Sequence, residues 1–232
     1  MRLPREQAMG IAGLGTGGLI VALMLPYATD ARVDAEPLGV LAVLAGFGSL
    51  AVMLAVAAAL TGSRHLVAAR LEAAALWAGC GLAVLLAVGA IATSAQTLDL
   101  RDVVLAQRNT AIYAFRQPVA AAIYATALAL AWQESALHAV LGPRTGERMV
   151  AQVLVVAALA GTGATLFLGG SAGERLAEPA WLALKTAGYA LVLLLVRWRL
   201  EGLADGARLA LAWLVAGAAL LNLMGTFVMV GR

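Results

Sequence analysis

The chain contains the apolar stretch Pro179-Ala-Trp-Leu-Ala-Leu-Lys-Thr-Ala-Gly-Tyr-Ala-Leu-Val-Leu-Leu-Leu-Val196. A stretch of this length is typical of a helix that crosses a lipid bilayer, which needs about 20 predominantly apolar residues. Lys185, the only lysine of the sequence, lies inside it. A cation within a membrane span is rare and usually has a role or a partner, so Lys185 is a candidate functional residue.

The composition of the whole sequence is that of an integral membrane protein. Hydrophobic residues make up 62% of the chain, charged residues make up 12%, and the mean hydropathy is +0.90. A water-soluble chain of 232 residues would carry far more charge. We therefore expect an all-α, polytopic protein that forms a single transmembrane domain over residues 1–232, with the lipid bilayer as its first partner.

Charged and turn residues divide the chain into seven apolar segments that are long enough to span a bilayer. Arg2 and Arg5 precede the first segment as they would in a signal peptide, but its apolar part is longer than a typical signal core, so we expect a retained helix. Abundant alanine and glycine predict close packing between the helices. The seven predicted spans are Ala8–Tyr27, Leu38–Thr61, Leu71–Ser94, Ile112–Gln133, Met149–Gly170, Ala180–Leu200 and Ala207–Val230.

The arginines predict the orientation of these spans. Cytoplasmic loops of membrane proteins carry an excess of Arg and Lys. The richer side here consists of the amino terminus and the second, fourth and sixth connections, with Arg2, Arg5, Arg64, Arg70, Arg144, Arg148, Arg197, Arg199 and Arg208. We expect a multi-pass protein of a bacterial-type cytoplasmic membrane, with a cytoplasmic amino terminus. The net charge of +3 therefore indicates orientation and not a nucleic-acid partner.

Several classes of function are disfavoured by the residues that the sequence lacks. The single cysteine, Cys80, excludes an internal disulfide and a four-cysteine metal or iron–sulfur site. His65 and His138 fall in short connections, where neither is placed to ligate a haem inside the membrane. Gly13-Leu-Gly-Thr-Gly17 lies in a predicted span without a preceding strand, so it is not a dinucleotide loop. We expect the chain to bind no cofactor and no metal of its own.

The connection Thr97-Leu-Asp-Leu-Arg-Asp-Val-Val-Leu-Ala-Gln107 alternates apolar and charged residues, which predicts a short amphipathic helix on the membrane surface. Together with Gln117-Pro118, Leu166-Phe-Leu-Gly-Gly170, Pro179-Ala-Trp-Leu-Ala-Leu-Lys-Thr186, Val196-Arg197 and Leu220-Leu-Asn-Leu-Met-Gly-Thr226, it forms an ordered set of motifs. This set resembles the H-type subunit, or subunit 1, of respiratory complex I and the related membrane-bound hydrogenases. The resemblance covers roughly Leu38 to the carboxy end.

The resemblance implies a fold and a role. Members of that family form the heel of the membrane arm, help to enclose a quinone chamber, and connect it to buried charges used in proton pumping. The family has eight spans and an outside amino terminus, and we expect its first span to have no counterpart here. The resemblance therefore implies an anchoring subunit that contacts other membrane and hydrophilic subunits and contributes to proton translocation.

The sequence departs from the family on the quinone side. Gly79-Cys80-Gly81 stands where the family has a Ser-Tyr-Glu element, and the long acidic cytoplasmic loop is reduced to Glu134–Arg148. Gln152 replaces a family glutamate and cannot exchange a proton at ordinary pH. We therefore predict a degraded quinone site, so that any quinone would bind at an interface with another subunit. The candidates for this side, or for docking a partner, are Glu134, Arg144, Glu147 and Gln152.

Three ionisable residues are candidates for a proton path: Lys185, Arg116 and Glu72. Lys185 and Arg116 lie about one and a half turns or less into their spans, where each could instead extend its cation to the interface. Glu72 begins the third span beside Arg70, where an interfacial ion pair is the simpler interpretation. No acidic residue lies deep in any predicted span, which argues against a self-contained proton wire.

The sequence supports three hypotheses, and none of them makes this chain a catalytic subunit by itself. The first is a diverged, shortened anchor subunit of a complex-I-like oxidoreductase. The second places the same scaffold in a membrane-bound nickel–iron hydrogenase or formate hydrogenlyase. The third is a free-standing small-solute transporter, although the sequence shows neither an internal repeat nor the broken mid-membrane helices that transporters use.

Overall fold

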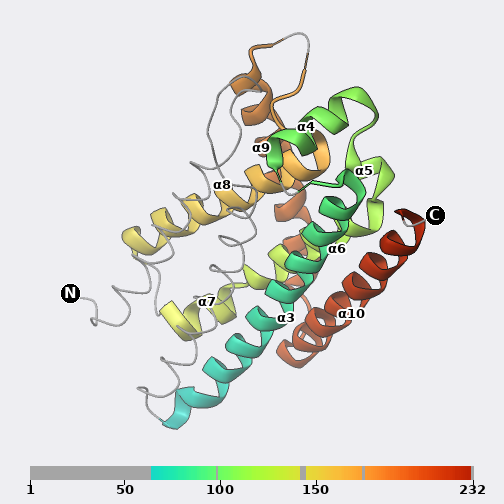
Figure 1. Ribbon diagram of the computed structural model, residues 1–232. Helices are drawn as coiled ribbons and strands as arrows, with labels where there is room; N and C mark the ends of the chain where they lie inside the picture. The colour runs from blue at the N-terminus through green and yellow to red at the C-terminus, as the bar shows by residue number, and fades with distance from the viewer. Residues whose placement is uncertain (1–63, 98, 142–144, 174–175, 231–232) are drawn as a thin grey trace.

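A computed structural model describes residues 64–97, 99–141, 145–173 and 176–230, and within these ranges the protein is helical, without strands (Figure 1). The predicted spans Ala8–Tyr27 and Leu38–Thr61 lie outside the described residues, as does Arg144. The described helices are α3 (Arg64–Ala95), α4 (Leu100–Asn109), α5 (Tyr113–Arg116), α6 (Pro118–Ala131), α7 (Glu134–Leu141), α8 (Gly146–Leu168), α9 (Glu178–Leu200) and α10 (Asp205–Val230).

Helices α3, α8, α9 and α10 are long and apolar enough to cross a membrane. They contain the predicted spans Leu71–Ser94, Ala180–Leu200 and Ala207–Val230 in full and most of Met149–Gly170. The described part of the protein is therefore all-α, and its four candidate spanning helices are those of a membrane-embedded protein. The count of seven spans and the position of the amino terminus stay predictions.

The predicted span Ile112–Gln133 is not one continuous helix, and this expectation is corrected. It divides at Gln117, whose backbone angles of φ −131° and ψ 57° are not helical. Pro118 follows, and a proline disfavours the helical conformation in the residue before it. Helix α6 then has 14 residues. At 1.5 Å per residue it rises about 21 Å, which is less than a hydrocarbon core of about 30 Å.

Helices α3 and α10 pack in parallel against each other (Figure 1). A Cβ built on Gly79 would lie 3.4 Å from the Cβ of Ala212, and one built on Gly89 would lie 3.7 Å from Leu223 Cδ1. From the first contact to the second, the residue number increases on both helices, so the two helices run in the same direction. Small residues allow this close approach, as the sequence predicted.

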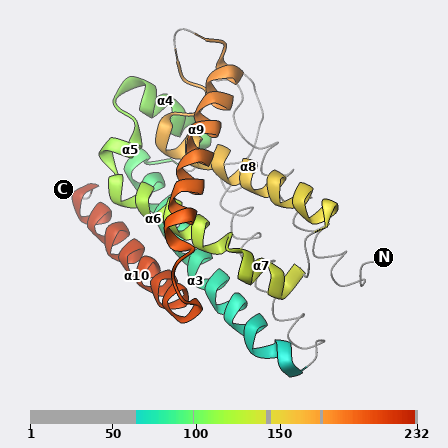
Figure 2. The same cartoon turned by 180° about the vertical axis from the view of Figure 1, so that it is seen from behind.

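The last turns of α8 cross the first half of α9 (Figure 2), and these two helices enclose an aromatic core with α6. The Tyr124 and Phe167 rings lie 5.4 Å apart between centroids, and Phe167 stacks on Tyr189 at 6.4 Å. Tyr124 also donates a hydrogen bond from its hydroxyl to the carbonyl of Leu159, at 3.0 Å. Three rings from three helices therefore form this part of the core.

Helices α9 and α10 leave most of their apolar surface uncovered. Only Leu182, Tyr189 and Leu193 are buried among the 23 residues of α9. The most apolar window of α3 is 61% buried, whereas those of α9 and α10 are 17% and 22% buried. Figure 2 shows α9 along its length, on the side of the molecule opposite to α3. An apolar surface of this extent suits lipid or neighbouring subunits and does not suit water.

We predict that Gly163→Ala destabilises the bundle by about 1–3 kcal/mol, as overpacking of a filled core does. A Cβ at this position would lie 2.5 Å from Tyr189 Cε1, and that ring is held against Phe167. The matched control is Gly188→Ala, because Gly188 is exposed on α9 with nothing within 4 Å. Thermal unfolding in detergent should show a lower midpoint for the first variant only. Equal midpoints would contradict the packing of α8 on α9.

Candidate functional site

The end of α8 is a turn of two glycines with left-handed backbones. Gly169 has φ +75° and Gly170 has φ +47°, a region that residues with a Cβ rarely adopt. The N–H of Gly170 donates to the carbonyl of Ala164 at 3.0 Å, which closes the last turn of α8. A Cβ on Gly170 would lie 3.1 Å from Val104 Cγ2. Glycine is therefore required here both by the backbone and by the approach of α4.

Helix α4 is fixed to this turn by Gln107. The Gln107 amide donates from Nε2 to the carbonyl of Thr165 at 2.9 Å, and its Oε1 accepts from the N–H of Tyr113 at 3.1 Å. Asp99 caps the start of α4 by accepting from the N–H of Arg101 at 2.8 Å. Most of the predicted amphipathic segment, from Leu100 onward, thus lies in α4, whose one buried face is formed by Leu100, Val103, Val104 and Gln107. Its position on a membrane surface stays a prediction.

Gln107 was not among the candidates predicted from the sequence, although its position in the amphipathic segment could have indicated it. Gln107 lies on the face of α4 that also buries Leu100, Val103 and Val104. A buried amide needs hydrogen-bond partners, so a lone polar residue on an apolar face indicates a specific contact. Its partners lie in α8 and at the start of α5, and neither could be known before the packing was known.

Lys185 lies beside the glycine turn and is half-buried. Its ammonium donates to the carbonyl of Ala172 at 2.6 Å and lies 5.4 Å from the centroid of the Trp181 ring. It is also 3.7 Å from where a Cβ of Gly169 would be. Among the described residues, this cation therefore contacts a backbone carbonyl and an aromatic ring.

The other two proton-path candidates do not meet Lys185. Arg116 is exposed, donates from Nη1 to Thr110 Oγ1 at 3.3 Å and lies 5.5 Å from the Tyr113 ring centroid. Glu72 is exposed near the start of α3, at the opposite end of the bundle from α4 and α5 (Figure 1). Arg70 donates from Nε to the carbonyl of Ala139 at 3.1 Å. Residues two apart on a helix do not face each other, so Arg70 and Glu72 point in different directions.

A second charged group lies at the other end of α8, where Arg148 pairs with Glu134. The distance from Arg148 Nη2 to Glu134 Oε1 is 2.6 Å, and the side chains are 0% and 38% exposed. Thr145 caps α8 by accepting from the N–H of Arg148 at 3.2 Å, so the helix begins before the predicted Met149. Arg148 is therefore part of a helix that packs near α7. The sequence had indicated it only as a charge in a connection.

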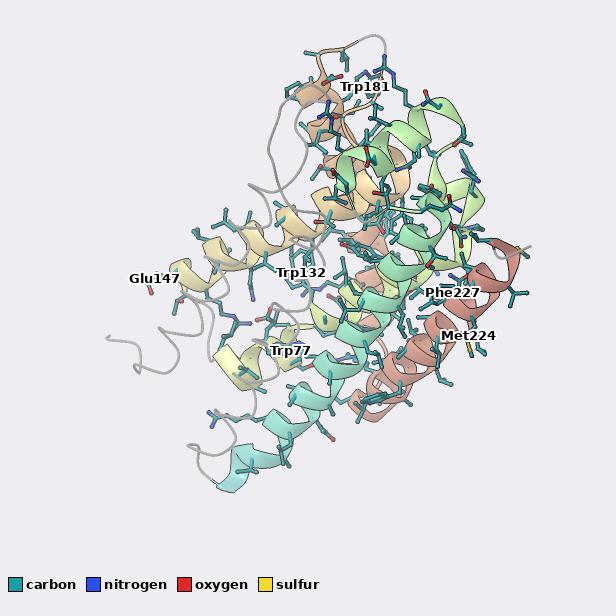
Figure 3. All side chains as sticks on the ribbon, viewed as in Figure 1. Trp77, Trp132, Glu147, Trp181, Met224 and Phe227 are labelled. Atoms are coloured by element: carbon teal, nitrogen blue, oxygen red, sulfur yellow. The ribbon has the colours of Figure 1, made fainter. Side chains whose placement is uncertain are left out.

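The other predicted quinone-side residues, Glu147 and Gln152, are not part of the Arg148–Glu134 ion pair. Glu147 is exposed and lies at the far tip of α8 (Figure 3). Gln152 is half-buried on α8, and its Nε2 has no hydrogen-bond partner among the described residues. Of Glu134, Glu147 and Gln152, only Glu134 contributes to the buried ion pair.

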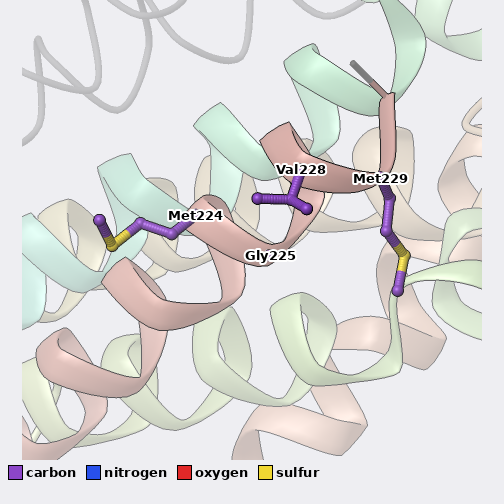
Figure 4. Close-up of a pocket in the computed structure, with 4 residues that line it drawn as sticks. All are labelled: Met224, Gly225, Val228 and Met229. Atoms are coloured by element: carbon purple, nitrogen blue, oxygen red, sulfur yellow. The ribbon is translucent and has the colours of Figure 1, made fainter. Parts of the chain in front are cut away.

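A shallow groove of about 380 Å³ lies on α10 (Figure 4). It is lined by Met224, Gly225, Val228 and Met229, none of which carries a polar side chain. In Figure 3, Met224 and Phe227 lie on the outer side of α10. The groove offers no group for acid, base or nucleophilic chemistry and belongs to the apolar surface of that helix.

The described residues contain no group of three or more His, Cys, Asp or Glu side chains that could hold a metal ion. The chain matches no family model and no curated protein. Its function is therefore inferred from its sequence motifs, its fold and its internal contacts.

We predict that Arg148 and Glu134 are energetically coupled by about 0.5–3 kcal/mol, because they form one ion pair in which Arg148 is fully buried and Glu134 is 38% exposed. A double-mutant cycle with Arg148→Met and Glu134→Gln, followed by thermal unfolding in detergent, measures this coupling. The control pair is Arg197 and Glu201, at 3.3 Å with Glu201 53% exposed, for which we expect less than about 0.5 kcal/mol. Coupling no larger than in the control pair would show that burial does not strengthen the contact.

Proposed function

We propose that the chain is the anchor subunit of a complex-I-like membrane oxidoreductase, shortened and without a complete quinone site. In this role it holds neighbouring membrane and hydrophilic subunits together and contributes to proton translocation only with groups supplied by those partners. It carries no electron carrier, and the redox chemistry belongs to other subunits.

The proposal is supported by one observation: the motifs on which the resemblance depends contact one another. Gln107 and Val104 of the Thr97–Gln107 motif contact the Leu166–Gly170 motif and the residue before it, Thr165. The Pro179–Thr186 motif reaches the same turn through Lys185. Segments that are far apart in the sequence thus form one contact cluster, which supports the view that they were retained as a structural unit.

The exposed apolar surface supports a role in assembly. Helices α9 and α10 together present Leu184, Leu191, Leu195, Leu214, Leu221 and Phe227, each with more than half of its surface exposed. Helices with so little buried side-chain surface are available for contact with lipid and with other membrane subunits.

The charges support anchoring more than an independent proton path. Lys185 is bonded to a carbonyl, Arg116 lies on the surface, and Glu72 is at the opposite end of the bundle. A proton wire needs titratable groups or water within hydrogen-bond reach of one another. The direct hydrogen bonds of Lys185 and Arg116 do not link these three residues to one another.

A free-standing transporter is the second candidate, because one observation favours it. Transporters commonly use helices that are broken inside the membrane. The region between α5 and α7 is such a break, with non-helical backbone at Gln117 and a short α6. The membrane-bound hydrogenase hypothesis shares the anchor scaffold and differs only in its partners.

The proposal is tested by purification of the tagged full-length chain in mild detergent and identification of what co-purifies. We expect hydrophilic iron–sulfur or nickel–iron subunits and antiporter-like membrane subunits in fixed ratio. Nickel–iron subunits without quinone reductase activity would indicate the hydrogenase version. A stable lone chain that moves a solute in proteoliposomes would refute the anchor role and support the transporter.

The predicted orientation is tested separately with single cysteines in a Cys80→Ala background. We expect a cysteine at Asp102, which is exposed on α4, to react with a membrane-impermeant maleimide from outside intact cells. A cysteine at Ser135, which is exposed on α7, should react only in inverted vesicles. Arginine-rich connections stay in the cytoplasm, which is the reason for this difference. Labelling of both positions from the same side would contradict the predicted arrangement.

A further inference from the structure

Three hydrogen-bond donors lie on the turn after α8 and on the first turns of α9, which contact each other. They are the Ser171 hydroxyl, the Trp181 indole N–H and the Lys185 ammonium. Lys185 bonds to the carbonyl of Ala172, the residue after Ser171. Trp181 covers Gly173, because a Cβ there would collide with the indole Nε1. The turn and the start of α9 are therefore in direct contact, and the site is defined by Ser171, Trp181 and Lys185.

Two of these donors are buried without a partner. Ser171 is 0% exposed, and neither its Oγ nor the Trp181 Nε1 has a hydrogen-bond partner among the described residues. A buried donor without a partner costs free energy, so nearly all such groups in proteins are bonded to protein, water or a ligand. Two in one short segment indicate a ligand that accepts hydrogen bonds.

The third donor supplies the charge. An ammonium can donate three hydrogen bonds, and only the bond to Ala172 involves a described residue. Lys185 is half-buried, so a ligand can reach it from the surface. It lies seven residues after Glu178, the first residue of α9, which corresponds to about 10 Å along the helix. This depth is within reach of the headgroup zone if α9 spans a bilayer.

We propose that Ser171, Trp181 and Lys185 form a binding site for a phosphate group. A phosphate carries several anionic oxygens that only accept hydrogen bonds, which matches one cation and two neutral donors. The group belongs either to a phospholipid headgroup or to free phosphate. Basic pockets between membrane helices recognise lipid headgroups by this chemistry. This inference does not depend on the proposed anchor role.

The test uses the full-length chain, purified in a maltoside detergent until it is free of phospholipid. Native mass spectrometry then counts bound phosphatidylglycerol, with an uncharged glycolipid of the same acyl chains as the reference. We expect Lys185→Met to weaken phosphatidylglycerol binding about tenfold or more, because a hydrogen bond to a charged group is lost. Trp181→Phe and Ser171→Ala should each weaken it several-fold. Trp181→Phe keeps a ring over Gly173 and removes only the N–H.

The controls come from a similar pair at the other end of α9, where Arg199 lies 5.5 Å from the Trp198 ring centroid and the glycine of the following turn, Gly202, does not have a positive φ. Trp198→Phe and Arg199→Met should bind phosphatidylglycerol as the unmodified chain does. Inorganic phosphate that displaces the lipid at millimolar concentration would assign the site to free phosphate, and no displacement would assign it to the headgroup.

The proposal is overturned if phosphatidylglycerol and the glycolipid bind equally, or if the Trp181 and Ser171 variants behave like the controls. Should Lys185→Met fail to fold, these two neutral variants still decide the outcome, because neither changes a charge.

Discussion

The described bundle depends on the left-handed turn at Gly169 and Gly170. Because both residues adopt positive φ, α8 ends abruptly and the chain can turn back toward α9. The absence of side chains at these positions also lets α4 and Lys185 approach the backbone closely. A larger residue would strain the backbone at either position, and at Gly170 its Cβ would also press on Val104 of α4. One local constraint thus determines how three helices meet.

The contacts at this turn explain how polar groups are accommodated in an apolar bundle. Gln107 satisfies a carbonyl of α8 and an N–H of α5, and Lys185 satisfies a carbonyl of the turn itself. The Arg148–Glu134 pair does the same at the opposite end of α8. The middle of the bundle, by contrast, is filled by apolar side chains, among them the rings of Tyr124, Phe167 and Tyr189 and many alanines. Charge is therefore confined to the two ends, which is the distribution that a bilayer favours.

Much of the helical architecture could be predicted from the sequence, because long apolar runs leave few alternatives. The run Ala180–Leu200 and the observed α9, Glu178–Leu200, differ only at the start. The break at Gln117 was missed because hydropathy continues through Pro118, whereas the backbone does not. The ion pair of Arg148 was missed because it depends on α7 and on where α8 begins. Lys185 was predicted as a functional residue from its apolar surroundings in the sequence. That it lies beside Trp181 and the turn containing Ser171 could be known only from the fold.

The most direct test of the role of the glycine turn is the accessibility of residue 103 when that turn is changed. Val103 is 2% exposed on α4, beside Val104, whose Cγ2 lies 3.1 Å from where a Cβ of Gly170 would be. In a Cys80→Ala background, a cysteine at position 103 should react slowly with maleimide in the folded protein. Addition of Gly170→Ala should raise its reaction rate, since a Cβ at φ +47° strains the turn and presses on Val104. Slow reaction in both proteins, or rapid reaction in both, would contradict the claim that the glycine turn holds α4 in place.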